Sequence, residues 1–162
     1  MHECYQQLER QGLLRRNERV LDVGCGTGQL SLPLIKRGYC VTGVDVAEEM
    51  LEKFRAKLSG TPGATLHLAD VRRLPLETHS MDVAVSSKLL MHVPRWELAV
   101  DEIVRVVRPK GRFLHIYERG AFVNTIRARF AAVCDALGYR NRHLGLQRED
   151  ELVNYLVSLG AQ

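Results

Sequence analysis

Three glycines at alternate positions, set between a strand-like run and a helix-like run, constrain this chain most strongly. Residues 20–29 read VLDVGCGTGQ, with glycine at positions 24, 26 and 28. A β-branched run that breaks into glycines predicts a buried strand that turns sharply into a helix. Such a turn brings bare backbone close to a ligand at the amino end of the helix. We therefore expect this loop to hold a ligand.

Apolar strand-like runs alternate with amphipathic helical stretches, which is typical of a parallel sheet with helices on both faces. The sequence therefore predicts an α/β fold with a doubly wound, mostly parallel, Rossmann-like sheet. Pro33 lies inside one expected helix, where it should remove a backbone hydrogen bond and kink the chain. Strands are expected at residues 19–23, 40–44, 64–68, 81–86 and 112–117, and helices at 5–14, 28–37, 47–58, 96–107, 122–137 and 149–159.

The length of 162 residues fits a single domain. Within it we expect an N-terminal helical segment (1–18), a ligand-binding core (19–117), a lid or insert (118–146) and a final helix (147–162). The late part of the chain is rich in arginine, and the whole chain carries a net charge of +4. This excess fits either a solvated helix face or a basic lid over an anionic substrate, and charge alone does not choose between them.

The cysteines and the lengths of the apolar runs indicate whether the chain binds a metal, forms disulfides or crosses a membrane. The four cysteines show no C-x-x-C pairing, so neither a zinc site nor a disulfide framework is indicated, and we expect no bound metal and a reducing, cytoplasmic location. The longest apolar runs are strand-length, well below the roughly 20 residues that a membrane-spanning helix needs.

The spacing of the glycines and of three aspartates limits which ligand the loop can hold. A dinucleotide fingerprint would need a third glycine at position 29, where Gln29 stands. Asp22, two residues before the first glycine, is awkward beside a pyrophosphate but suits a ligand that carries an ammonium and a sulfonium. Asp45 and Asp70 each follow a strand and suit the ribose hydroxyls and the exocyclic amine of an adenosine. A solvated strand-end carboxylate remains the alternative for each acid taken alone.

Several motifs, in order, resemble the class I S-adenosylmethionine-dependent methyltransferases, in particular the small-molecule branch that includes ubiquinone and menaquinone biosynthesis enzymes. The resemblance covers residues 17–116. Its specific parts are VLDVGCGTG, VTGVDVAEEML, LHLADVRRLPL, MDVAVSSKLLMHV and EIVRVVRPKGRFLH.

The resemblance implies S-adenosyl-L-methionine as the cofactor and assigns roles to individual residues. Asp22 would orient its amino group, and Asp45, with Val46 beside it, would bind both ribose hydroxyls. The loop residues around the methionine part would be Gly24, Cys25, Gly26, Thr27 and Gly28.

On the adenine side, Met50 would pack against the ring, and Asp70 would accept a hydrogen bond from the adenine amine. The backbone N–H of Val71 would contact the adenine ring. Ser86 would offer its backbone carbonyl to the ammonium. For Met50 and Val71, plain core packing is an equal alternative.

Two departures from the family pattern stand out. Ala47 replaces the serine that often caps the helix there, at a cost of about 1 kcal/mol. The family sheet ends with antiparallel strands six and seven, and the sequence ends where strand six should begin. We therefore expect these two strands to be missing and interpret the chain as part of a longer protein.

Methyl transfer from a sulfonium is a direct displacement, so a base is needed only for a poorly acidic nucleophile. His92, after the fourth expected strand, is the candidate base, with a loop-ordering hydrogen bond as the alternative. Lys88 is a weaker candidate for a substrate-facing charge.

A small-molecule acceptor, anionic or lipid-like, is expected. The stretch SSKL replaces the D/N/S-P-P-Y/F motif of amino-methylating DNA enzymes, and no Pro-Cys nucleophile of cytosine-C5 enzymes occurs. An RNA acceptor, a non-catalytic cofactor-binding module and a nicotinamide oxidoreductase remain as alternatives, and the sequence does not indicate an oligomeric state.

Overall fold

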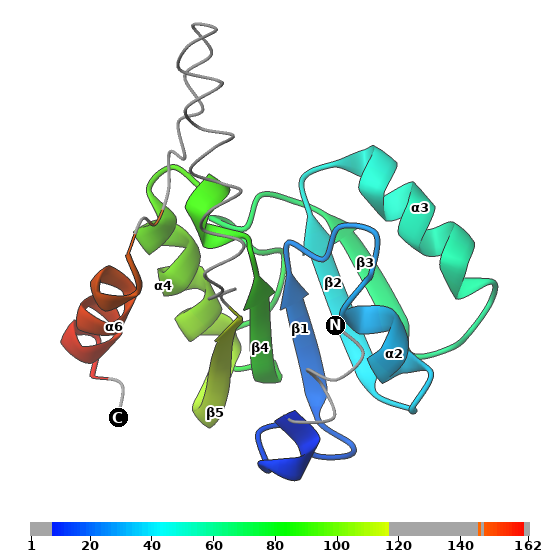
Figure 1. Ribbon diagram of the computed structural model, residues 1–162, viewed down its shortest axis with the longest axis horizontal. Coiled ribbons are helices and arrows are strands. Elements are labelled where there is room, and N and C mark those ends of the chain that lie inside the picture. The colour runs from blue at the N-terminus through cyan, green and yellow to red at the C-terminus, as the bar shows by residue number, and fades with distance from the viewer. Residues whose placement is uncertain (1–7, 117–145, 147, 161–162) are drawn as a thin grey trace, which may run out of the picture.

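A computed structural model describes residues 8–116, 146 and 148–160. These residues hold one five-stranded sheet in which all neighbouring strands run parallel, in the order β3-β2-β1-β4-β5 (Figure 1). The predicted doubly wound α/β fold is confirmed. The strands are β1 (Arg19–Val23), β2 (Cys40–Asp45), β3 (Ala64–Leu68), β4 (Met81–Ser87) and β5 (Val107–Ile116).

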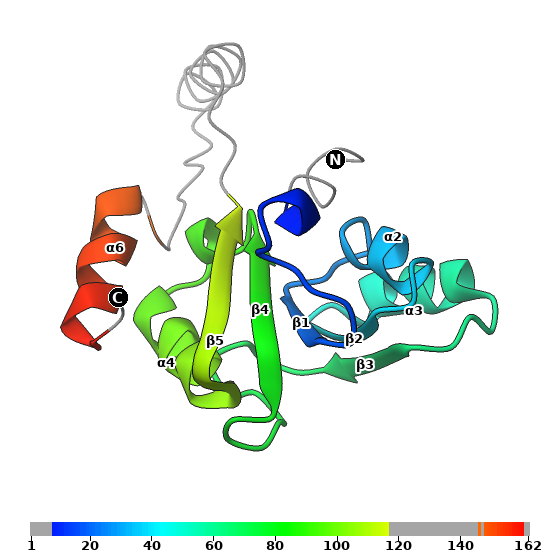
Figure 2. The same ribbon diagram turned by 90° about the horizontal axis from the view of Figure 1, so that it is seen from below.

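Helices cover both faces of the sheet. α2 and α3 lie on one face, and α4 lies on the other with α6 beside it (Figures 1 and 2). Their bounds are α2 (Ser31–Ile35), α3 (Glu48–Leu58), the 3₁₀ turn η1 (Leu90–His92), α4 (Trp96–Val106) and α6 (Glu149–Ser158). Residues 8–10 are also helical.

The alternation of side chains along β1 divides the core into two layers. Leu21 and Val23 join the cluster under α4, whereas Val20 joins the cluster under α2 and α3. Successive strand residues point to opposite faces, so both faces of this central strand need apolar cover. Asp22 lies on the same face as Val20, and its burial there needs a specific explanation.

The helix after the glycine loop is shorter than predicted. It begins at Ser31 instead of at Gly28, because Gly28 has a φ of +76° and cannot belong to a right-handed helix. Pro33 is the third residue of α2 and has no backbone N–H, whereas the N–H of its neighbour Leu32 donates to the Gly28 carbonyl at 2.9 Å. The expected loss of one backbone hydrogen bond at Pro33 stays a prediction.

The last strand begins earlier than predicted. β5 pairs with β4 from Val107, directly after α4, and the expected Pro-Lys-Gly turn forms a bulge inside the strand. Met81 pairs with Val107 and Val83 with Arg112, so β5 uses three more residues than β4 over this stretch. Lys110 takes the left-handed conformation, with a φ of +64°, within the bulge. The other strands and helices of the predicted core agree with the structure to within one residue.

Two side chains of α4 hold the loop that follows β3. Glu102 Oε2 accepts a hydrogen bond from the Leu74 N–H at 2.7 Å. Arg105 donates to the carbonyls of Leu74 and Leu76 at 3.2 and 2.9 Å and also pairs with Glu102. These contacts fix the segment that begins with Asp70.

Some predictions fall on residues outside this description. The lid at 118–146, except Leu146, and the helix at 122–137 lie there, as do Cys4 and Cys134. Among the described residues the sheet has no antiparallel strand. No helix in the described part is both long and apolar enough to cross a bilayer.

Candidate functional site

The glycine loop joins β1 to α2 at the carboxyl edge of the sheet, between β2 and β4. Its three glycines, Gly24, Gly26 and Gly28, all have positive φ, at +73°, +52° and +76°. The Val44 carbonyl accepts hydrogen bonds from the N–H groups of Gly24 and Cys25, at 2.8 and 3.1 Å. The end of β2 therefore fixes the loop, and glycine supplies the left-handed backbone that the turn needs.

Space as well as conformation requires glycine in this loop. A Cβ at Gly24 would overlap the side chain of Leu89, and one at Gly28 would overlap the ring of Phe54. A Cβ at Gly26 would meet no atom within 4 Å. Gly26 lines the cavity beside the loop, so its bare backbone faces open space there.

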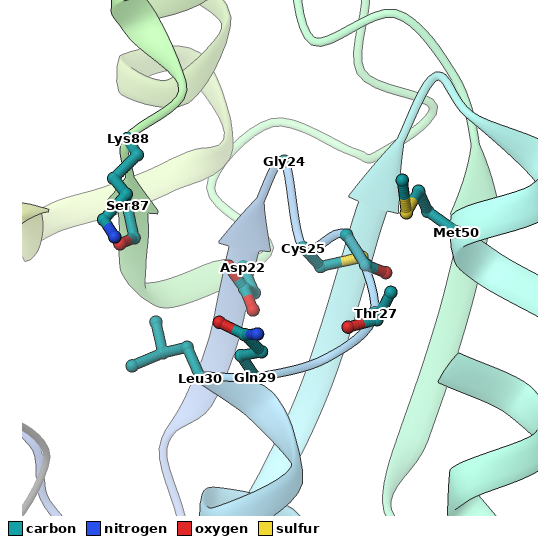
Figure 3. Close-up of a pocket in the computed structure, with 10 residues that line it drawn as sticks. Asp22, Gly24, Cys25, Thr27, Gln29, Leu30, Met50, Ser87 and Lys88 are labelled. Atoms are coloured by element: carbon teal, nitrogen blue, oxygen red, sulfur yellow. The ribbon is translucent and has the colours of Figure 1, made fainter. Parts of the chain in front are cut away.

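A first cavity of about 320 Å³ lies against the loop (Figure 3). Met50 from α3 and Lys88, the residue after β4, lie on opposite sides of it. Its lining residues are Asp22, Gly24, Cys25, Gly26, Thr27, Gln29, Leu30, Met50, Ser87 and Lys88.

Asp22 is the buried charge of this cavity, with only 2% of its surface exposed. The hydroxyl of Ser31, the first residue of α2, donates a hydrogen bond of 2.5 Å to Asp22 Oδ2. Burial raises the pKa of Asp22 to about 6, although the hydrogen bond from Ser31 lowers it; the nearby charge of Asp45 raises it further. A buried carboxylate beside a cavity favours a cationic ligand group, which would compensate the lost hydration.

Cys25 is not poised as a nucleophile. Its side chain is buried, and burial raises the pKa of the thiol far above its ordinary value, with the carboxylates of Asp22 and Asp45 adding to the shift. The thiol packs close to Gly43, where a Cβ would come within 2.9 Å of Cys25 Sγ. Cys25 therefore shapes the loop as a small packing residue.

A second cavity of about 220 Å³ shares Gly24 with the first, so the two meet at the tip of the loop. It lies where strands β2 and β3 end. Its lining residues are Gly24, Asp45, Val46, Asp70, Val71, Arg72, Leu89, His92, Val93 and Pro94.

Asp45 links the second cavity to the loop. Its Oδ2 accepts from the N–H of Gly26 at 2.8 Å, and its Oδ1 accepts from the N–H of Ala47 at 3.0 Å. Each carboxylate oxygen has a second lone pair, so both can still accept a hydrogen bond from a ligand hydroxyl.

Asp70 is paired with its neighbour Arg72 in a way that sequence reasoning missed. Asp70 Oδ1 accepts from the backbone N–H of Arg72 at 2.9 Å, and the guanidinium forms a salt bridge with the carboxylate. These contacts with Arg72 lower the pKa of Asp70. Asp70 is therefore ionised at neutral pH and can accept a further donor with its remaining lone pairs.

The structure brings most of the predicted residues together but separates a few. Ser86 is fully buried and lines neither cavity, whereas its successors Ser87 and Lys88 line the first. His92 lines the second cavity, with Asp45 and Asp70. Gly28 lines neither cavity and lies against the ring of Phe54.

Several lining residues were not predicted, among them Gln29, Leu30, Arg72 and Leu89. Three of these directly follow a predicted residue in the chain, so adjacency to the motifs could have indicated them. In the described part of the chain no group of three His, Cys, Asp or Glu residues could hold a metal ion.

Known proteins resemble this chain both in sequence and in structure. A phosphatidylethanolamine N-methyltransferase of Cereibacter sphaeroides is 40% identical over 99 residues, which make up 59% of this chain and 48% of that protein. An uncharacterised 37.1 kDa protein of a Streptomyces fradiae transposon is 36% identical over 62% of this chain and 30% of its own length. The chain thus spans about a third to a half of the curated relatives that it matches.

Solved structures share the fold. The YcgJ protein of Bacillus subtilis superposes on 98% of this chain and 68% of its own, with a TM-score of 0.77 and 22% identity. An S-adenosylmethionine-dependent methyltransferase of Mesorhizobium loti covers 71% of this chain and 53% of its own, with a TM-score of 0.59 and 29% identity.

The family comparison spans the described core. The family model described as "Methyltransferase domain" matches residues 21–115, from β1 and the glycine loop to the end of β5. More than half of the chain, including both cavities, falls within this match. The chain belongs to the methyltransferase domain family.

Proposed function

We propose that the two cavities bind S-adenosylmethionine and that the protein transfers its methyl group to a small-molecule acceptor. The observation that carries this proposal is the set of three carboxylates, Asp22, Asp45 and Asp70, around one glycine loop. The first cavity holds a buried carboxylate, which suits the ammonium of the methionine part. The second has two carboxylates that accept hydrogen bonds, which suits a ribose and an adenine amine.

The residues divide between the two ends of the cofactor. Asp22 and the loop residues 24–27, which line the first cavity, would hold the methionine end, whereas the buried Ser86 lies outside this lining and is assigned no contact. Asp45 and Val46 would hold the ribose. Met50, Asp70 and Val71 would hold the adenine. Gly24, common to both cavities, fits the point where the two ends join.

When bound, S-adenosylmethionine supplies an activated methyl group on its sulfonium. The chain contributes alignment: the fixed loop and the buried carboxylate hold the donor end in one orientation relative to the acceptor. Lys88 lines the first cavity and suits an anionic group, on the acceptor or on the methionine carboxylate.

His92 is our candidate for the group that takes a proton from the acceptor. Its place beside Asp45 and Asp70 equally suits a contact with the adenosine part. The variant His92→Ala distinguishes the role as a base from the role as an adenosine contact. If His92 is the base, His92→Ala loses turnover and keeps its affinity for S-adenosylhomocysteine. If His92 holds the adenosine, the affinity falls instead.

For the acceptor we propose a small molecule with lipid-like or anionic character. Support comes from the likeness to the phosphatidylethanolamine N-methyltransferase and from the arginine-rich segment after β5. The cysteine pattern supports a cytoplasmic location. Transfer of a labelled methyl group to phosphatidylethanolamine vesicles, and not to RNA, would support this acceptor class. Transfer to RNA alone would contradict the small-molecule acceptor and favour an RNA acceptor. Tight cofactor binding with no methyl transfer to any acceptor would favour a non-catalytic binding module.

The cofactor assignment is tested by calorimetric titration of the full chain with S-adenosylhomocysteine. We expect micromolar binding that weakens at least about tenfold in Asp45→Ala, because hydrogen bonds to a charged group are lost. The matched control is Asp101→Ala, which removes an exposed aspartate of α4 that accepts from Tyr155, outside both cavities. Equal affinity in wild type and Asp45→Ala would contradict the assignment of Asp45.

A further inference from the structure

Neither residue that pairs with Asp22 in the sheet offers its carboxylate a side-chain hydrogen bond. Asp22 pairs in register with Gly43 of β2 and Val85 of β4, neither of which carries a polar side chain. A buried carboxylate without a hydrogen-bond donor is costly and free to rotate. The orientation of the Asp22 carboxylate therefore depends on groups above the sheet.

Ser31 provides such a group. It is the first residue of α2, is fully buried, and donates its hydroxyl hydrogen to Asp22 Oδ2 at 2.5 Å. Ser31 stands nine positions after Asp22 in the chain, beyond the glycine loop. The bond therefore ties the start of α2 to the end of β1, next to a residue that lines the first cavity.

The hydrogen bond engages Oδ2. Asp22 lines the cavity, and among the described residues no hydrogen bond engages its second oxygen, Oδ1, which can therefore accept one from a ligand. Because a carboxylate is planar, a donor that fixes one oxygen also fixes the direction of the other. The Ser31 hydroxyl also favours the charged form of Asp22, because it lowers the pKa that burial raises.

We propose that Ser31 is a positioning residue: its hydroxyl holds the Asp22 carboxylate in the orientation in which it receives the ligand's ammonium. This inference rests on the proposed function, since it takes the first cavity as the site of the methionine part. It assigns to Ser31 no contact with the ligand, because Ser31 lines neither cavity.

Two ligands distinguish positioning from general support of the fold. S-adenosylhomocysteine carries the ammonium, whereas 5′-methylthioadenosine shares the adenosine and lacks the amino-acid part. We expect Ser31→Ala to lower the affinity for S-adenosylhomocysteine about five- to tenfold, because one charge-assisted hydrogen bond that acts indirectly is lost. It should leave the affinity for the second ligand unchanged.

A double-mutant cycle tests whether Ser31 acts through Asp22. In an Asp22→Asn background, Ser31→Ala should cause no further loss of S-adenosylhomocysteine affinity, because the charged group that it orients is gone. Ser80→Ala is the matched control, since it removes a serine hydroxyl that bonds a backbone carbonyl far from both cavities.

Three results would overturn the inference while leaving the proposed function intact. The first is an unchanged S-adenosylhomocysteine affinity in Ser31→Ala. The second is an equal loss of affinity for both ligands in that variant. The third is a loss of S-adenosylhomocysteine affinity on Ser31→Ala that is as large in the Asp22→Asn background as in the wild type. If the wild-type chain binds neither ligand, the proposed function fails, and the inference fails with it.

Discussion

At the scale of single residues, the site depends on three carboxylates, and each is held by a different hydrogen-bond partner. Asp22, Asp45 and Asp70 are found at or just beyond strand ends, because parallel strands place their carboxyl ends along one edge. The partners of these acids depend on tertiary packing and on rotamers. Ser31 meets Asp22 across the whole glycine loop, and the pairing of Arg72 with Asp70 requires one particular turn after β3.

The raised pKa of Asp22 predicts that the affinity for S-adenosylhomocysteine rises with pH. Asp22 is ordinarily ionised above pH 3.8, but in the fold its pKa is about 6. Its ionisation therefore destabilises the folded chain above pH 6, and this cost is relieved as pH falls from 6 toward 4. A ligand ammonium favours the ionised form. Affinity should fall about tenfold between pH 7 and pH 5, measured by calorimetry.

The control for this pH dependence is a ligand without the ammonium. The affinity for 5′-methylthioadenosine should stay flat over the same range, and Asp22→Asn should remove the pH dependence for S-adenosylhomocysteine. Parallel pH curves for the two ligands would contradict the assignment of Asp22 to the ammonium.

At the scale of elements, prediction from the sequence succeeds where the hydrophobic period is clear. β3 and α3 have the expected bounds because their apolar residues keep a period of two or of three to four, and Ala47 occupies the cap position without a side-chain hydrogen bond, as expected. The errors at α2 and β5 arise from backbone conformation and pairing. The positive φ of Gly28 shortens one element, and the pairing of Val107 with Met81 lengthens the other.

The contact between α4 and the loop after β3 predicts a link between stability and adenosine binding. Glu102→Ala leaves the buried Leu74 N–H without its acceptor and frees Arg105, so we expect a loss of about 2 kcal/mol in the free energy of unfolding. Urea denaturation measures this loss. The affinity for 5′-methylthioadenosine should also fall severalfold, because the loop carries Asp70 and Val71.

Glu52→Ala, at an exposed glutamate of α3, is the matched control for Glu102→Ala and should change neither quantity. Loss of stability in Glu102→Ala with unchanged adenosine affinity would contradict a role of α4 in fixing this loop.

At the scale of the whole molecule, the site follows from the topology of the sheet. The strand order reverses at β1: the chain moves from β1 to β2 and β3 on one side, and then to β4 and β5 on the other (Figure 1). Ligands of open parallel sheets bind outside the carboxyl ends of the strands at such a switch point. Both cavities contact the loop after β1 and the carboxyl end of β4 or the residues that follow it, and the second also contacts the residues at the ends of β2 and β3.

The topology alone suits a dinucleotide as well as S-adenosylmethionine, and the difference lies in the glycine spacing and the buried charge. Gln29 occupies the position of a third fingerprint glycine, and Asp22 would oppose a pyrophosphate. The fold is thus predicted by pattern over the whole core, whereas the choice of ligand rests on a few side chains.

The most direct test is a competition experiment on the 162-residue chain, in which S-adenosylhomocysteine and NADH are titrated separately and against each other by calorimetry. We expect micromolar binding of S-adenosylhomocysteine and no displacement of it by equimolar NADH. Tighter binding of NADH, or a folded chain that binds NADH alone, would contradict the proposed cofactor.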